Sequence, residues 1–298
     1  MASCASNPTP LCHARSISLP SRPNPLVLNI DEQAQRLSSS SEATTPSSSS
    51  SLSHRLSKLQ DLLDSLNVLL QLTHTRQLLS RESHEYKVDE LLSSSLYFLD
   101  VCSIAKDVLV QRREQAQDLQ SVLRRKRGDE SELMKESAKY LALGKKSKRQ
   151  ISKSLRDLKS KCSNWSPAES EPNTEATFSM FRKAELASSA VFGSLLSFLL
   201  GPKAQSKASS WSLRPKFIVS SKRVSPEQES SSEFEDVDSM LQALIHGKKG
   251  KNFSLRQEDL QGGLWKMQSS IQELEEQLES MLRCIIRTRA SLLNILTH

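Results

Sequence analysis

Residues 260–295 read LQGGLWKMQSSIQELEEQLESMLRCIIRTRASLLNI, and this stretch decides the fold. Apolar residues recur in it in alternating steps of four and three, a mean of about 3.5 residues, which is the period of a helix facing another helix. Ten of the eleven positions are apolar, and the exception, Thr288, still carries a methyl group: Leu260, Leu264, Met267, Ile271, Leu274, Leu278, Met281, Ile285, Thr288, Leu292 and Ile295. No proline follows Pro226, so we predict one long helix whose seam is covered by helices of this chain or another.

The same kind of spacing predicts further helices earlier in the chain. The apolar stripe of the second one is wider than a two-stranded coil needs, which indicates a multi-helix bundle. Gly128-Asp129 and Gly201-Pro202 are typical of helix ends. The expected helices span about 52–70, 86–127, 130–162, 175–200, 233–246 and 254–298. We therefore predict an all-α fold, an elongated multi-helix bundle of about five or six helices with a coiled-coil-like C-terminal helix.

Two stretches of biased composition flank or interrupt the helical pattern. Residues 1–50 are rich in serine and proline, and such a segment cannot bury enough apolar area to offset the entropy of ordering it. We expect a disordered tail over 1–50 and a helical bundle domain over 51–298. Residues 202–232, rich in serine and lysine, are expected to form an internal loop. Residues 1–30 contain no acidic residue and so resemble an organelle transit peptide, although their prolines fit an amphipathic targeting helix poorly.

The composition limits the protein class and the compartment. Hydrophobic content of 37% and aromatic content of 5% are low for a compact enzyme, and the five cysteines show no metal-like spacing. With no signal peptide, they indicate a reducing compartment without disulfides, and we expect a cytoplasmic protein, with the nucleus or an organelle less favoured. No apolar run reaches the roughly 18–20 residues that span a bilayer. The nearest, Leu186 to Leu200, is either a buried bundle helix or a membrane-surface segment.

The search for catalytic motifs yields only incomplete ones. His84-Glu85 begins a zinc-protease pattern, but Val88 stands where the second histidine is needed. Gly144-Lys145-Lys146-Ser147 resembles the end of a phosphate-binding loop, yet Lys139 replaces its first glycine. We therefore predict that the protein is not an enzyme and that it needs no cofactor or metal.

Positive charge is concentrated in one region of the chain. Residues 124–162 hold fourteen Lys/Arg against five Asp/Glu, whereas the remainder holds 27 basic and 29 acidic residues. The region is a solvated helix face, a contact for an anionic membrane surface, or a nuclear-import or nucleic-acid segment. Tyr140 is its only aromatic residue, which weakens the nucleic-acid interpretation because bases stack on aromatic rings. The candidate contacts are Arg124, Arg125, Lys126, Arg127, Lys145, Lys146, Lys148, Arg149 and Lys153.

A short motif in the N-terminal tail predicts regulation by phosphorylation. Residues 15–20, RSISLP, fit the pattern R-S-x-S-x-P that 14-3-3 proteins bind when its second serine is phosphorylated. A phosphate on Ser18 adds about two negative charges, which suit an arginine-lined groove. The candidate residues are Arg15, Ser16, Ser18 and Pro20, although a basic tail rich in serine and proline also matches such a pattern by chance.

Several segments together resemble one known family. They are RSISLPSRP at 15–23, LQDLLDSLNVLLQL at 59–72, VDELLSSSLYFLDVCSIAKDVL at 88–109, LQSVLRRKRG at 119–128 and RTRASLLNILTH at 287–298. The chain resembles the plant-specific BYPASS-like proteins, to which no established catalytic activity is attached. The resemblance implies a non-enzymatic interaction or adaptor protein linked to root and shoot development. The alternative is a peripheral membrane protein that docks through the basic region 124–162. Protein partners other than 14-3-3 stay open, and self-association is possible through the C-terminal helix.

Overall fold

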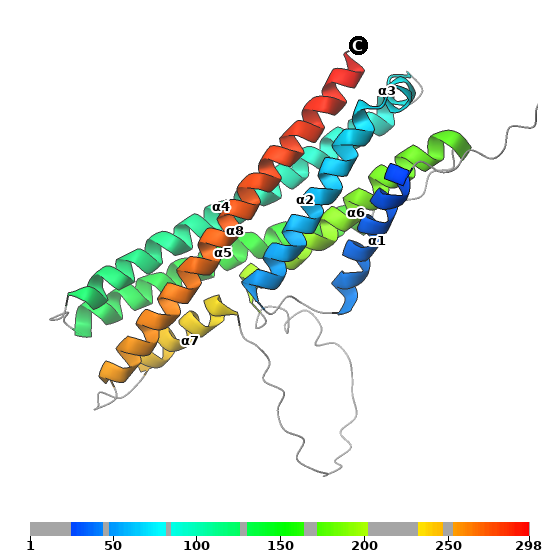
Figure 1. Cartoon of the computed structure of the whole chain (residues 1–298). Coiled ribbons are helices and arrows are strands. Elements are labelled where there is room, and N and C mark those ends of the chain that lie inside the picture. Colours follow the sequence, from blue (N-terminus) through cyan, green and yellow to red (C-terminus); the bar gives the residue numbers. More distant parts are fainter. Residues whose placement is uncertain are drawn as a thin grey trace, which may run out of the picture.

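The computed structural model describes residues 25–43, 48–81, 85–125, 130–163, 172–201, 232–246 and 253–297. In this part of the chain every regular element is a helix, as Figure 1 shows, which confirms the all-α prediction. The described residues form eight helices rather than five or six: α1 (Pro25–Ala43), α2 (Ser49–Gln71), α3 (Thr73–Leu79), α4 (Glu85–Arg124), α5 (Glu130–Ser163), α6 (Pro172–Leu200), α7 (Glu233–His246) and α8 (Phe253–Leu296).

The helices form an elongated bundle in which α8 contacts α2, α4 and α7 (Figure 1). Ion pairs Lys106–Glu279 and Arg113–Glu275 run in opposite sequence order, so α4 and α8 are antiparallel. The hydroxyl of Ser280 donates to Gln60, and Arg287 pairs with Asp64 at 2.9 Å, so α2 and α8 are parallel. The C-terminal helix is therefore clamped between two helices from distant parts of the sequence.

The seam of α8 is buried within its own chain. Each of its eleven residues is at most 8% exposed, and Leu274 and Leu278 are fully buried. Thr288, the polar member, donates its hydroxyl to the carbonyl of Cys284 at 3.1 Å, so its polar atom is satisfied inside the helix. The sequence left open whether helices of this chain or of another chain cover the seam. In the structure, neighbouring helices of the same chain cover it.

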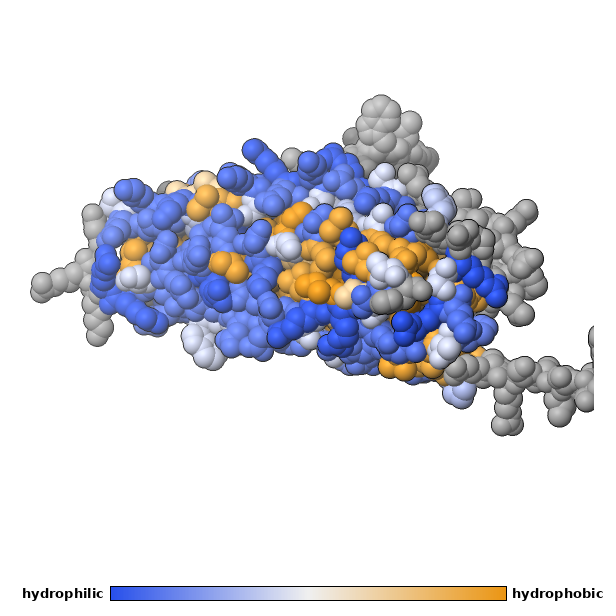
Figure 2. All heavy atoms as spheres, turned by 90° about the horizontal axis from the view of Figure 1, so that it is seen from above, coloured by the Kyte–Doolittle hydropathy of each residue, from blue (hydrophilic) through white to orange (hydrophobic). Residues whose placement is uncertain are grey.

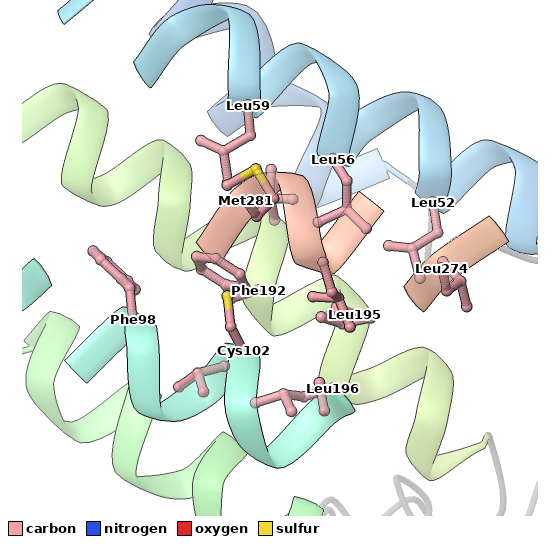
Figure 3. Packing of buried hydrophobic residues seen from close by; sticks show 14 of the residues in the cluster. Leu52, Leu56, Leu59, Phe98, Cys102, Phe192, Leu195, Leu196, Leu274 and Met281 are labelled. Carbon is pink, nitrogen blue, oxygen red and sulfur yellow. The ribbon is translucent and has the colours of Figure 1, made fainter. Parts of the chain in front are cut away.

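The core is one continuous cluster to which all eight described helices contribute. Figure 3 shows Leu56 and Leu59 of α2, Cys102 of α4, Phe192 of α6 and Met281 of α8 pointing into it, and all five are fully buried. Burying a large apolar side chain stabilises a fold by about 1.5–3 kcal/mol, so this cluster is the main source of stability. On the face shown in Figure 2, hydrophilic residues cover most of the surface and hydrophobic residues gather in a smaller central patch.

The prediction of a disordered tail over residues 1–50 is wrong for residues 25–43. Pro25 does not break this segment but begins α1, because proline lacks only an N–H that the first helical turn leaves unpaired anyway. Ile30, Ala34 and Leu37, spaced by four and three, are buried, and α1 packs on α6 and α2. The bundle therefore begins before residue 51.

Several helix ends agree with the sequence, whereas α4 ends at Arg124 rather than near residue 127 and α6 begins at Pro172 rather than near residue 175. α7 has the predicted bounds, and α6 ends at the predicted Leu200. Gly201 follows it with a φ of +77°, which suits glycine, and its N–H donates to the carbonyl of Ser197 at 3.1 Å. The unpredicted break is at Leu72, whose extended backbone separates α2 from the short α3. The predicted loop 202–232 lies outside the described residues except for Ser232, which accepts the N–H groups of Glu235 and Asp236 at the start of α7.

Helix α6 is the apolar segment that the sequence left between core and membrane. Among the described residues, one helical segment, Thr177–Leu200, is long and apolar enough to cross a bilayer. However, 72% of its most apolar window is buried, and α6 packs against α1, α2, α4 and α5. The packing favours the buried bundle helix over the membrane-surface segment.

A buried polar cluster joins α4, α5 and α7. Arg112, 4% exposed, lies 3.3 Å from Asp238 Oδ1, and Lys148 lies 2.9 Å from Asp238 Oδ2. The guanidinium of Arg112 also lies 4.7 Å from the centre of the Tyr140 ring, a cation–π contact. Gly144 lies against the guanidinium of Arg112, so a side chain at position 144 would collide with it. The cluster therefore holds the Arg112 side chain in a single place.

We expect Gly144→Ala to lower the free energy of unfolding by about 1–3 kcal/mol, because overpacking a rigid site is destabilising. A Cβ there would lie 2.7 Å from Nη2 of Arg112, which Asp238 and Tyr140 keep from moving away. Gly262→Ala is the control: no atom of a neighbouring described residue lies within 4 Å of a Cβ built there, so this change should stabilise by about 0.5–1 kcal/mol. Urea denaturation measures both, and equal stabilisation by the two alanines would contradict the described packing of Arg112.

Candidate functional site

The basic residues singled out from the sequence lie in different structural environments. Arg124 and Arg125 are exposed at the end of α4, and Arg125 Nη1 lies 3.6 Å from Glu132 Oε1. Lys126 and Arg127 lie outside the described residues. Lys148 is half-buried and paired with Asp238, so its charge belongs to the polar cluster and is not available to a partner.

The other four candidates lie on one exposed side of α5. Lys145, Lys146, Arg149 and Lys153 are exposed and have no ion-pair partner in the described part of the chain. At about 100° of rotation per residue they fall on the same side of the helix as Arg156 and Lys159, which are exposed and equally unpaired among the described residues. We call these six residues the basic stripe: Lys145, Lys146, Arg149, Lys153, Arg156 and Lys159.

The basic stripe is a compact surface of positive charge whose six cations form no ion pair among the described residues. Its six cations occupy about 140° of the helix circumference and about 21 Å of its length, at about 1.5 Å per residue. Arg156 and Lys159 are absent from the sequence-based candidates, although the steps from Arg149 through Lys153 to Arg156, of four and three, already place Arg156 on this face.

A shallow hollow of about 360 Å³ adjoins one end of the basic stripe. Its apolar lining comes from Leu141 and Ile245, with Ala138 and Ala142. Lys145, Lys146 and Arg149 complete the lining with three positive charges. An apolar floor beside several cations suits a partner that carries both negative charge and some apolar surface.

A second hollow, of about 320 Å³, lies between α4 and α8 around an exposed tryptophan. Trp265 is 70% exposed, and we call this place the Trp265 hollow, lined by Arg113, Gln117, Trp265, Gln268, Ser269 and Gln272. Arg113 is held by Glu275, and Gln268 accepts a hydrogen bond from Gln120 at 2.9 Å, so the lining is positioned by α4–α8 contacts. The sequence offered one signal for it: Trp265 lies outside the apolar seam of its helix.

The described residues hold no group of three or more His, Cys, Asp and Glu side chains that could bind a metal ion. Burial raises the pKa of both the Cys102 and the Cys284 thiol to about 12, and hydrogen bonding to Asp64 adds to this effect at Cys284. Neither thiol therefore has the thiolate character of a nucleophile. The tail motif of Arg15, Ser16, Ser18 and Pro20 lies outside the described residues.

Comparison with known families now identifies the bundle. The model of the family described as Protein BPS1 matches residues 55–295. The chain belongs to the BPS1 family. The match runs from α2 to α8 and includes the basic stripe and the Trp265 hollow, but not α1 or the tail motif. It confirms the resemblance to the plant BYPASS-like proteins, whereas no curated protein and no solved structure matches the chain.

Proposed function

We propose that this BPS1-family protein is a non-enzymatic adaptor that binds another protein in plant developmental signalling, in root and shoot. Family membership supports the plant developmental setting. The Trp265 hollow supports the binding role, because it places a large aromatic side chain that is 70% exposed beside the guanidinium of Arg113. Tryptophan and arginine are also the residues that most often dominate the binding energy of protein interfaces.

The geometry of the Trp265 hollow supports a preorganised contact. Arg113 and Gln268 are tied to neighbouring helices, so they lose little side-chain freedom when a partner binds. The polar lining from Gln117, Ser269 and Gln272 offers hydrogen-bond donors and acceptors around the indole. We infer that the partner inserts an apolar side chain against Trp265 and pairs polar groups with this rim.

We expect Trp265→Ala to weaken partner binding by at least tenfold, because truncating a central interface tryptophan costs about 2 kcal/mol or more. Affinity purification from plant tissue, with quantitative mass spectrometry, compares this variant with the wild type. The control is Tyr86→Ala, which removes an aromatic residue that is 81% exposed elsewhere on the bundle. If the proteins recovered with Trp265→Ala match those recovered with the wild type, the Trp265 hollow is not the binding surface.

The basic stripe favours a second candidate, a peripheral membrane protein in the cytoplasm. Six cations without partners among the described residues face one direction, and each well-placed basic residue contributes about 1 kcal/mol of attraction to an anionic lipid surface. The described part of α5 exposes no large apolar side chain that could insert between lipids. The contact would therefore be electrostatic and sensitive to salt.

We expect Lys145→Glu with Arg149→Glu to reduce binding to phosphatidylserine-containing vesicles by at least about thirtyfold, because two favourable charges are lost and reversed. The control pair, Lys58→Glu with Lys266→Glu, changes the net charge equally at exposed positions on α2 and α8. Vesicle cosedimentation at two salt concentrations measures the effect. The membrane candidate would be excluded if the wild-type protein did not bind anionic vesicles. It would also be excluded if the α5 double variant and the control double variant bound them equally well.

A further inference from the structure

The shallow hollow at one end of the basic stripe combines positive charge with apolar surface, and we call it the Ile245 hollow. It lies between α5 and α7, which pack against each other, and measures about 360 Å³. No acidic residue occurs in its lining, which consists of four apolar residues and three cations: Ala138, Leu141, Ala142 and Ile245, with Lys145, Lys146 and Arg149. The hollow therefore suits a single amphipathic anion.

The three cations meet at the Ile245 hollow because of their spacing on α5. Lys145 lies four residues and Lys146 three residues before Arg149, so the three side chains are neighbours on the helix surface. Long helical side chains lean toward the preceding turn, so the two lysines extend over the turn that contains Leu141. One phosphate group bound there can contact more than one of these cations.

The convergence of three cations favours a phosphomonoester over a phosphodiester. A phosphomonoester carries about 1.5–2 negative charges at neutral pH and three strong acceptor oxygens, whereas a phosphodiester carries a single charge. The planar guanidinium of Arg149 can donate to two phosphate oxygens at once, and the two lysines add compact point charges. The additional charge and the additional acceptor of a monoester are therefore both used in the Ile245 hollow.

The apolar part of the Ile245 hollow favours a lipid over a soluble sugar phosphate. Leu141 and Ala142 precede the two lysines by four residues, which is about 6 Å along the helix. In phosphatidic acid the glycerol and its acyl esters follow the phosphate within a few bonds, with no polar headgroup in between. A sugar phosphate would instead place hydroxyl groups against Leu141 and Ile245, where they lose water without gaining a hydrogen-bond partner.

We propose that the Ile245 hollow binds the phosphomonoester headgroup of phosphatidic acid. The phosphate lies at Lys145, Lys146 and Arg149, and the first carbons of the acyl chains lie against Leu141 and Ile245. This inference rests on the proposed membrane candidate and adds a lipid preference to it. The basic stripe attracts any anionic surface, whereas the Ile245 hollow selects one headgroup.

The first test uses short-chain lipids below their micelle concentration, so that no membrane surface is present. Titration of protein with labelled isoleucine methyl groups reports binding through Ile245, which lines the hollow. We expect dihexanoyl phosphatidic acid to bind at least tenfold more tightly than dihexanoyl phosphatidylglycerol, a phosphodiester, and than glycerol 3-phosphate, which has no acyl chain. The proposal is overturned if the Ile245 signal does not shift, or if either comparison compound binds as tightly as dihexanoyl phosphatidic acid.

Two variants with the same change in net charge show whether binding occurs in the Ile245 hollow. Ala142→Glu places a carboxylate on its apolar part, four residues before Lys146, and should weaken binding of dihexanoyl phosphatidic acid at least tenfold. Gln150→Glu adds the same charge at an exposed position of α5 outside the hollow and should change the affinity by less than about twofold. Circular dichroism checks that both variants fold, and an equal loss of affinity in the two would overturn the proposal.

Vesicles distinguish failure of this proposal from failure of the membrane candidate. Phosphatidylcholine vesicles that contain phosphatidic acid or phosphatidylserine are compared at equal surface charge. The wild type should bind those with phosphatidic acid at least tenfold more tightly, and Ala142→Glu should remove this preference while Gln150→Glu keeps it. Equal binding of the wild type to both kinds of vesicle overturns the lipid preference alone, whereas no binding to either overturns the membrane candidate as well.

Discussion

Leu274→Asp should unfold most of the bundle. Leu274 is fully buried in the middle of the α8 seam, and an unpaired carboxylate there loses its hydration as well as the apolar contacts of leucine. We expect a loss of about 5 kcal/mol or more, comparable to the whole stability of an ordinary domain. Thermal unfolding followed by circular dichroism measures the change, and Leu278→Asp should behave alike because Leu278 is equally buried.

Ser269→Asp is the matched control for the seam variants. Ser269 lies on the same helix but is exposed, so the same new charge should change the free energy of unfolding by no more than about 0.5 kcal/mol. If Leu274→Asp and Ser269→Asp melt at similar temperatures, the α8 seam is not the interior of the bundle.

Asp238→Ala should lower the free energy of unfolding by about 3–5 kcal/mol, because it leaves a buried guanidinium without its counter-charge. Arg112 is 4% exposed and lies 3.3 Å from Asp238, so after the change it cannot reach water without moving out of the core. Lys148→Met, which removes the half-exposed partner of the same carboxylate, should cost much less. Urea denaturation of the three proteins gives the comparison.

A double variant separates loss of the ion pair from loss of packing around Asp238. Replacing Arg112 by methionine in the Asp238→Ala background removes the stranded charge and keeps most of the side-chain volume. The double variant should therefore be more stable than Asp238→Ala alone. If the double variant is less stable than Asp238→Ala alone and also less stable than Arg112→Met alone, the account of this cluster is contradicted.

The parts of the fold that the sequence predicted are those set by local apolar spacing. The seam from Leu260 to Ile295 needs only the helical period to be recognised, and its burial follows because apolar surface of that length cannot face water. α1 was missed for a local reason: Pro25 and the neighbouring serines suggested a disordered tail, whereas Ile30, Ala34 and Leu37 carry the helical spacing. The break at Leu72 lies in the middle of a leucine-rich run that contains no glycine or proline.

The candidate sites depend on contacts that the sequence does not show. Lys148 looked like any other cation of its cluster until the fold placed Asp238, ninety residues away, beside it. Trp265 could be assigned to an outer face from the helical period, but the companion role of Arg113 depends on how α4 and α8 pack.

Hydrogen exchange of α8 in monomeric protein tests the central claim most directly. The α8 seam is covered by α2, α4 and α7 of the same chain, so backbone amides between residues 264 and 285 should be among the slowest to exchange in a 33.4 kDa monomer isolated by size-exclusion chromatography. Rapid exchange of these amides in the monomer, with protection gained only on self-association, would contradict it.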